Sequence, residues 1–158
     1  MSSQILSEQL LSEPKLQGWI SFLRAHAAVT RELSGRLEAA HGLTLSDFDV
    51  LAQLYRAPGN ALRRVDLSRQ VLLTASGITR LLDGLERAGW VEKRRCDSDA
   101  RVSYAALTKD GLAKLEEART THLADIEELF GSRFSDEERA TLAELLGRLP
   151  LAETTCTE

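Results

Sequence analysis

The sequence predicts a mainly α-helical fold with one small β-hairpin, and three observations support this prediction. Apolar residues recur at helical spacing in several stretches, of which residues 15–41 are the longest. Only 3 prolines interrupt the 158 residues, so long segments lack the strongest helix breaker. Two short strand-like runs, residues 90–95 and 101–107, flank a polar tip at residues 96–100, a pattern typical of a hairpin.

Capping residues and glycines divide the helical part into six predicted helices. The first, residues 15–41, ends before Gly42, and the second begins at Ser46, with Ser46 and Asp49 expected to form a capping box. A turn at residues 57–60 follows. The remaining predicted helices are residues 63–71, residues 74–88 with Thr74 as N-cap and Gly89 as the stop, residues 108–131 with Thr108 as N-cap, and residues 135–149 with Ser135 opening a capping box.

The order of these elements indicates a winged helix-turn-helix with a helical dimerisation region. Three helices followed by a hairpin is the order of that fold, in which the second helix of the pair enters the major groove of DNA. We therefore expect three parts: residues 1–45 as N-terminal arm and dimerisation helix, residues 46–107 as the DNA-binding domain, and residues 108–158 as C-terminal dimerisation helices and tail.

The distribution of charge supports contact with nucleic acid, although the whole chain has a net charge of -4. Residues 56–101 hold ten Lys or Arg against six Asp or Glu, and the rest of the chain holds ten against eighteen. The middle of the chain is therefore basic inside an acidic frame. This asymmetry directs one face at phosphate and keeps the remainder away from it.

Residues 74–88 carry the most informative pattern. On a helical wheel, one side is apolar and the opposite side carries Ser76, Thr79, Arg80, Asp83 and Arg87. An arginine can form paired hydrogen bonds with guanine, so Arg80 is expected to read a base. Gly77 allows close backbone approach, and Thr74 with the free amides of the first turn suits a phosphate.

The predicted hairpin and the helix before it add further basic residues. Arginines near a flexible tip suit the minor groove, and Asp99 is expected to brace the tip by pairing with them. Asp83 is expected to pair with Arg80, Arg87 or an arginine of the hairpin. The full predicted DNA-contacting set is Arg63, Arg64, Arg69, Thr74, Ser76, Gly77, Thr79, Arg80, Arg87, Lys93, Arg94, Arg95, Asp99 and Arg101.

The sequence lacks the signatures of several other classes of protein. The sequence has no phosphate-binding loop, no GxGxxG and no GxSxG, so an enzyme is not expected, and neither a metal nor a cofactor is expected from the scattered histidines His26, His41 and His122. Cys96 and Cys156 lack paired spacing, and the N-terminus lacks a secretory pattern. We expect a cytoplasmic protein that does not enter the membrane.

The wing and the helix before it resemble the MarR family of bacterial transcriptional regulators. Asp99-Ala100-Arg101, followed after five residues by Leu107-Thr108, matches the wing signature of that family, and residues 72–91 resemble its recognition helix and exit. The resemblance covers residues 16–149 and implies a homodimer that binds a palindromic operator on double-stranded DNA. It also implies that Asp99 and Arg101 hold the wing, that Asp83 steadies a wing arginine, and that Gly84 replaces a residue that is often basic.

The resemblance further implies a small-molecule effector, bound in a pocket between the first, second and fifth predicted helices and the DNA-binding lobe. Residues 19–51 look like the subgroup that responds to urate and related anions, for which Trp19, Asp49 and Arg80 are the expected binding residues; an aromatic acid is the wider ligand class. Two alternatives stay open at this point. One is a redox response through Cys96, and the other is a dimeric helical adaptor that binds protein and not DNA.

Overall fold

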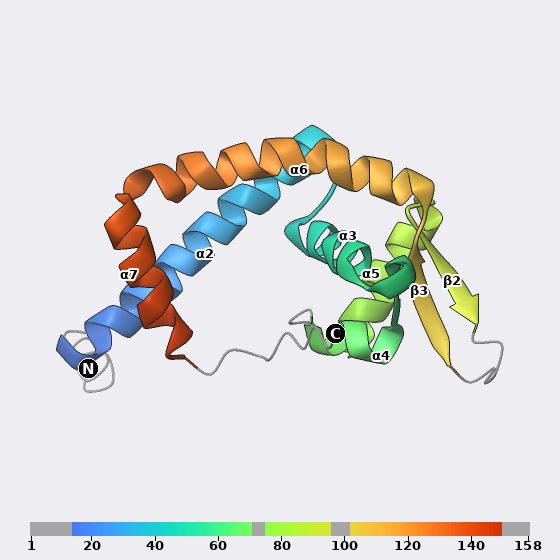
Figure 1. Cartoon of the computed structure of the whole chain (residues 1–158), viewed down its shortest axis with the longest axis horizontal. Helices are drawn as coiled ribbons and strands as arrows, with labels where there is room; N and C mark the ends of the chain where they lie inside the picture. The colour runs from blue at the N-terminus through green and yellow to red at the C-terminus, as the bar shows by residue number, and fades with distance from the viewer. Residues whose placement is uncertain (1–13, 71–74, 96–101, 150–158) are drawn as a thin grey trace, which may run out of the picture.

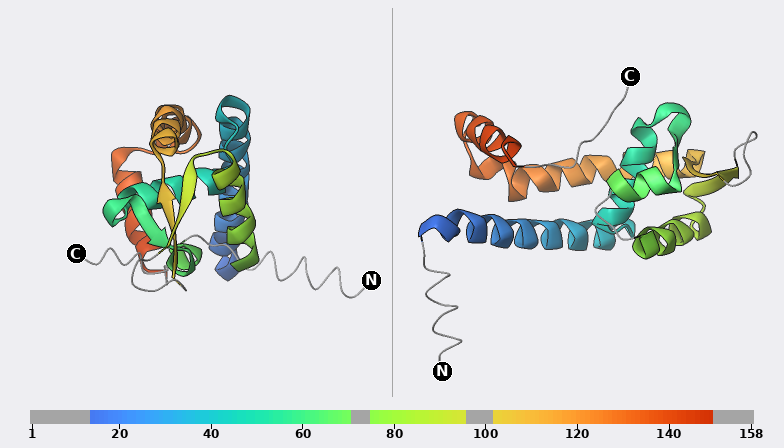
Figure 2. Two further views of the ribbon diagram at one scale, coloured as in Figure 1. Left: turned by 90° about the vertical axis from the view of Figure 1, so that its right-hand side faces the viewer. Right: turned by 90° about the horizontal axis from the view of Figure 1, so that it is seen from below.

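The computed structural model describes residues 14–70, 75–95 and 102–149. Figure 1 shows an arch in which α2 (Pro14–His41) and α6 (Lys109–Leu129) form the span. The two helices run side by side (Figure 2). At one end lies a lobe of short elements: α3 (Leu45–Arg56), η1 (Pro58–Asn60), β1 (Ala61–Arg63), α4 (Arg64–Gln70), α5 (Ala75–Arg87), β2 (Val91–Arg95) and β3 (Ser103–Leu107). At the other end lie η2 (Gly131–Arg133) and α7 (Asp136–Gly147). The predicted fold class, mainly α with a winged helix-turn-helix, is confirmed.

The start of α3 corrects one sequence prediction. The N-cap is Thr44 and its capping-box partner is Asp47, so the expected pair Ser46 and Asp49 is wrong. Both pairs have the spacing of a capping box. The earlier start is favoured because it leaves Leu43 fully buried just before the helix, with Phe48 packed against the same core. The expected N-caps Thr108 of α6 and Ser135 of α7 are confirmed, the latter with Glu138 as its capping-box partner.

The sheet has three strands and not two. The predicted hairpin exists as β2 and β3, and β1 adds to it in the antiparallel order β1-β3-β2, with Leu62 opposite Ala105. The sequence did not predict β1, because three residues are too few to show the alternation of a strand. The hairpin tip, residues 96–101, lies outside the described residues.

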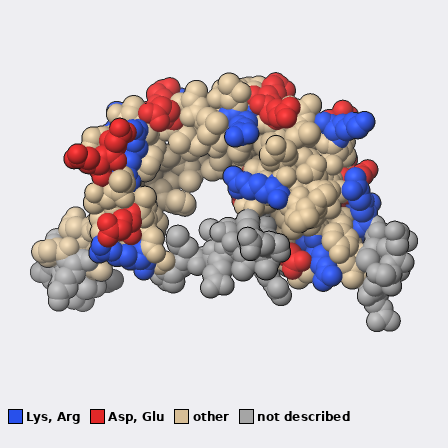
Figure 3. All heavy atoms as spheres, in the orientation of Figure 1, with Lys and Arg blue, Asp and Glu red and all other residues tan. Residues whose placement is uncertain are grey.

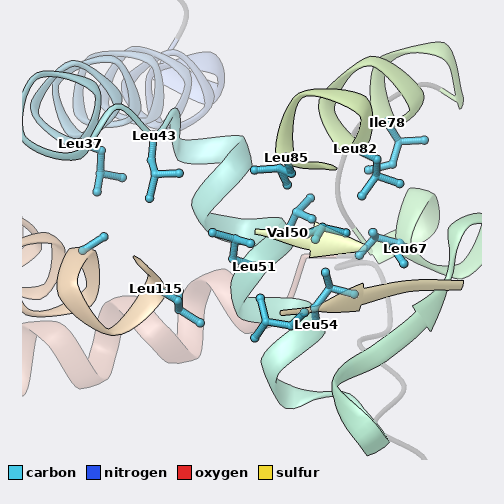
Figure 4. Packing of buried hydrophobic residues seen from close by; sticks show 14 residues of the cluster. Leu37, Leu43, Val50, Leu51, Leu54, Leu67, Ile78, Leu82, Leu85 and Leu115 are labelled. Carbon is cyan, nitrogen blue, oxygen red and sulfur yellow. The ribbon is translucent and has the colours of Figure 1, made fainter. Parts of the chain in front are cut away.

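The core lies where the lobe meets the span. Figure 4 shows leucines of α3, α5 and α6 pointing toward one another, together with Leu37 and Leu43. The apolar side predicted for α5 is confirmed for Ile78, Leu82 and Leu85, which are buried. Ala88 was expected on that side and is exposed, because it follows the last turn of the helix. Along the described ranges, no helix has the length and apolarity needed to cross a bilayer.

Candidate nucleic-acid interface

The outward face of α5 presents the residues predicted to read DNA. Thr79, Arg80 and Arg87 are exposed, while the opposite face of the helix is buried in the lobe. Arg87 donates from Nε to the backbone oxygen of Asp83 at 3.1 Å, which holds the arginine along the last turn. Gly77 is half-buried in the first turn. The helix therefore offers a polar, cationic surface fixed from behind by apolar packing.

Arg64 ties α4 to α5. Its Nη2 lies 3.2 Å from Glu86 Oε1 and 3.5 Å from Asp83 Oδ1. Asp83 was expected to pair with Arg80, Arg87 or a wing arginine, and its described ion-pair partner is Arg64. Arg64 therefore helps to set the angle between the two helices of the helix-turn-helix, a role that its predicted phosphate contact did not include.

The sheet carries a second group of cations beside α5. Lys93 and Arg94 are exposed on β2, and Arg94 Nε lies 2.7 Å from Glu92 Oε1. On β1, Arg63 donates from Nε to the Tyr104 hydroxyl at 3.3 Å, and its guanidinium lies 6.0 Å from the centre of that ring. Because Arg63 is held against the sheet in this way, its charge has a defined position.

The remaining predicted contacts fall at the limits of the described residues. Thr74, Asp99 and Arg101 lie outside them, as does Cys96. Arg69, Ser76 and Arg95 lie on α4, α5 and β2 respectively, which places them on the lobe without describing their side chains. On the face drawn in Figure 3, Lys and Arg side chains lie on the lobe and also along α6 and at the end of the molecule that carries α7, where acidic side chains lie beside them.

Comparison with known proteins identifies the family. A model of the MarR family matches residues 41–102, which span α3 to the wing. YetL, an HTH-type transcriptional repressor of Bacillus subtilis, is 34% identical over 111 residues, covering 70% of this chain and 66% of the relative. YdgJ, an HTH-type transcriptional regulator of the same organism, is 29% identical and covers 94% of each chain. The chain belongs to the MarR family.

Solved structures of the MarR family share the whole arrangement. Sco3205 from Streptomyces coelicolor, solved in complex with DNA, has a TM-score of 0.79 and 25% identity, covering 86% of this chain and 89% of that one. A mutant of MarR from E. coli, complexed with operator DNA, has a TM-score of 0.74 and 26% identity, covering 87% and 95%. This MarR-family chain is a transcriptional regulator of the helix-turn-helix type and not an enzyme.

Within a single copy of this chain, the three residues expected to bind an effector lie on separate helices. Trp19 is exposed near the start of α2, about 33 Å along the helix from His41 at 1.5 Å per residue. Asp49 lies on α3 and Arg80 on α5, both at the other end of the arch (Figure 1). The structure of a single chain therefore does not bring Trp19 to the other two residues.

Asp49 has no capping role and sits partly buried on α3. Burial raises the pKa of its carboxyl, while a contact from Gln53 Nε2 at 3.5 Å and the charge of Arg56 oppose this shift. A carboxylate held in this setting is more costly than one in water. Asp49 therefore contacts Gln53 on the same helix and does not cap it.

A pocket of about 390 Å³ lies between α3 and α6. Its lining is largely apolar, with cationic and polar groups around it; the α3 side consists of Phe48, Ala52, Tyr55 and Arg56, and the α6 side of Leu112, Leu115, Glu116, Arg119, His122, Leu123 and Ile126. His122 is buried and its ring lies 4.6 Å from that of Phe48. Its Nδ1 has no hydrogen-bond partner among the described residues.

The resemblance to the family implied a pocket between the first, second and fifth predicted helices and the DNA-binding lobe, but the residues that line this pocket were not predicted. Its two walls are far apart in the chain, and its most polar buried group, His122, looked like an isolated histidine. Among the described residues, no cluster of three or more histidine, cysteine, aspartate or glutamate side chains could hold a metal ion. The lining of the pocket is mostly apolar with a few polar groups, a composition that is common in sites for small organic molecules.

Proposed function

We propose that this chain is a homodimeric repressor that binds a palindromic site on duplex DNA and is released from it by a small aromatic or anionic ligand. The observation that carries the proposal is the outward face of α5, where Arg80 and Arg87 are exposed although the lobe has already completed its core. Relatives of the same fold that were solved with DNA, and the name of the relative YetL as a repressor, support it. A regulator of bacterial genes acts in the cytoplasm, where the chromosome lies.

The proposed dimer would cover the apolar surface at the far end of the arch. No residue of α7 is buried within the single chain, and large apolar side chains of α2, α6 and the C-terminal segment are exposed. They include Leu16, Trp19, Phe22, Leu23, Leu123, Phe130, Phe134, Leu145 and Leu149. Exposed apolar surface of this extent is typical of an interface between subunits. A two-fold axis through it would present two lobes to two half-sites of a palindrome.

The DNA-binding proposal is tested with a pair of substitutions. Arg80→Ala together with Arg101→Ala removes one proposed base contact and one proposed minor-groove contact, each worth roughly 1–3 kcal/mol. We expect a loss of duplex affinity of tens to tens of thousands of times and a shallower dependence on salt, with the proposed dimer intact. Affinity is measured by fluorescence anisotropy on a duplex that the wild-type protein has selected from a random library.

A matched control removes the same charge elsewhere. Arg24→Ala with Arg31→Ala changes two exposed arginines of α2, at a distance from the lobe. This control is expected to bind the selected duplex as the wild type does. Equal affinity of the Arg80/Arg101 variant and the wild type would favour the helical adaptor instead of the DNA-binding protein.

The effector proposal rests on the pocket between α3 and α6. A planar ring would fit beside Phe48 and Tyr55, and the unpartnered Nδ1 of His122 would be satisfied by a ligand hydroxyl or carboxyl group. Arg56 and Arg119 at the lining favour a negative charge. A ligand that binds the DNA-free arrangement better than the DNA-bound one would shift the equilibrium toward release.

Urate and salicylate, titrated at millimolar concentration into the protein–duplex complex, test this step. Release is expected for at least one of them. Ala52→Leu narrows the pocket, and Asp49→Asn neutralises the carboxyl of the expected urate-binding group on the same helix. If release requires an unfilled pocket, Ala52→Leu abolishes it and Asp49→Asn does not; the reverse result would assign the ligand to Trp19, Asp49 and Arg80.

A further inference from the structure

The C-terminal end of α5 is closed by a Schellman motif. Gly89 has a φ of 77°, a left-handed conformation that glycine adopts without strain. Its N–H donates to Glu86 O at 3.0 Å, and the N–H of Trp90 donates to Leu85 O at 3.0 Å. These bonds satisfy two carbonyls of the helix end and leave the carbonyl of Gly89 pointing out of the motif.

The hydroxyl of Thr108 joins that carbonyl to α6. It donates to Gly89 O at 2.7 Å and accepts from the N–H of Gly111 at 3.0 Å. A hydroxyl has one proton and two lone pairs, so both bonds form at once. The N–H of Thr108 also donates to Trp90 O at 3.1 Å. One side chain thus caps the start of α6 and holds the end of α5.

The two helix ends approach as closely as the backbone allows. A Cβ on Gly111 would lie 2.0 Å from Trp90 O and 2.9 Å from Leu107 Cδ1, so only glycine fits at this position. One turn further along α6, Lys114 Nζ lies 5.7 Å from the centre of the Trp90 ring. The contact between the end of α5 and the start of α6 is therefore close, and its hydrogen bonds fix how the two helix ends are oriented.

We infer that Thr108 is a positioning residue that sets the angle of the recognition helix α5 relative to α6. The inference rests on the proposed function, in which α5 enters the major groove and α6 leads to the dimer interface. A tilt of about 10° at this point would move the far end of α5 by roughly 3 Å, since its 13 residues span about 20 Å. Hydrogen bonds to base edges do not survive displacements of that size.

The same two turns of α6 also line the pocket. Leu112, Leu115 and Glu116 lie on the first two turns of α6 and line the pocket opposite α3. A ligand that displaces these turns would move the Thr108 hydroxyl and, through it, the exit of α5. Thr108 therefore lies on a hydrogen-bonded route from the pocket to the end of the recognition helix.

Three variants separate this role from ordinary helix capping. Thr108→Val removes both hydroxyl bonds, and Thr108→Ser keeps them. Thr108→Asp keeps an acceptor for the Gly111 N–H, and so caps α6, but cannot donate to Gly89 O. The matched control is Thr44→Val, which removes the hydroxyl of the N-cap of α3, whose partners all lie in Asp47.

The readout is discrimination, measured as the ratio of affinities for the selected duplex and a scrambled duplex. We expect Thr108→Val and Thr108→Asp to lose at least about tenfold of this ratio, the size of one base contact. Thr108→Ser and Thr44→Val should retain it, although Thr44→Val should lower the melting temperature as Thr108→Val does. In a Trp19→Phe background, the fluorescence of Trp90 should change in Thr108→Asp while the circular dichroism stays that of the folded wild type.

Two outcomes would overturn the inference. If the wild type discriminates and Thr108→Asp is folded with the same ratio, Thr108 is only a helix cap and the proposed function stands. If the wild type does not discriminate between the two duplexes, the proposed function fails and the inference fails with it.

Discussion

The two ends of the arch differ in how they are held together. In the winged lobe, Leu51, Leu54, Leu67 and Leu82 are completely buried, and three helices and the sheet share one core. At the opposite end, which we call the arm (the first half of α2, the second half of α6, and α7), Trp19 is 56% exposed and Leu145 is 48% exposed. The lobe is complete within one chain, and the arm is not.

Polar contacts join the α6 part of the arm to the second half of α2. Arg36 of α2 donates to Asp125 Oδ1 at 2.9 Å and to both carboxylate oxygens of Glu128 at 3.0 and 3.1 Å, all on α6. These bonds lower the pKa of the Glu128 carboxyl. Exposed ion pairs contribute little to stability, but they fix geometry. Charge therefore shapes the arm within the chain, and the apolar burial that the arm lacks would come only from the proposed dimer.

The largest expected effect tests the lobe. Leu82→Ala leaves a cavity in the completed core and should lower the free energy of unfolding by roughly 2–5 kcal/mol. Because the core lies within one chain, this loss should be the same at every protein concentration. Urea denaturation followed by circular dichroism, repeated over a wide concentration range, measures it. A loss that grows on dilution would show that the lobe depends on the partner after all.

The second effect tests the arm. Leu145→Asp places a charge on the exposed apolar face of α7 and should weaken the proposed dimer by about 2 kcal/mol or more, the cost of an interface hot spot, while the lobe stays folded. Sedimentation equilibrium measures the dissociation constant. Ala140→Asp is the matched control, because it adds the same charge to the opposite side of α7. Equal dissociation constants for the two variants would remove the arm from the interface.

Local patterns explain what the sequence predicted about the fold. The buried side of α5 and the caps at Thr108 and Ser135 depend on residues within four positions of one another, so they can be predicted from the sequence. The start of α3 was misread because Thr44-Asp47 and Ser46-Asp49 have the same spacing, and only the burial of Leu43 separates them. Strand β1 exists because β3 offers it an edge, which is a property of the folded chain.

The candidate site also has features that the local sequence predicts and features that only the packed fold shows. Exposure of Thr79, Arg80 and Arg87 follows from the helical wheel alone. The pairing of Arg64 with Glu86, 22 positions away, and the contact of Phe48 with His122 require the packing of elements that no periodicity reveals. The residues predicted to contact DNA follow from local chemistry, whereas the approximate place of the pocket came only from the family resemblance and its lining residues could not be predicted from the chain.

The smallest expected effect concerns the seam between lobe and arm, where His122 of α6 packs on Phe48 of α3. Burial lowers the pKa of His122 from its ordinary 6.5, and the charge of Asp125 opposes this shift only in part. The folded state therefore binds fewer protons than the unfolded state below pH 6.5. Stability should be constant above that pH and should fall as the pH drops from 6.5 toward the lowered pKa of the folded protein.

Replacing the ring isolates this contribution. His122→Phe keeps an aromatic contact with Phe48 but cannot titrate, so its melting temperature should fall less than that of the wild type between about pH 7 and about pH 5, the range in which histidine changes charge. His26→Phe is the control, because His26 is exposed on α2 and the substitution replaces a histidine away from the seam. If only His122→Phe flattens the dependence of melting temperature on pH, protonation destabilises the protein where the lobe meets the arm. Identical profiles for His122→Phe and the wild type would mean that the imidazolium is accommodated at the seam without separating α3 from α6.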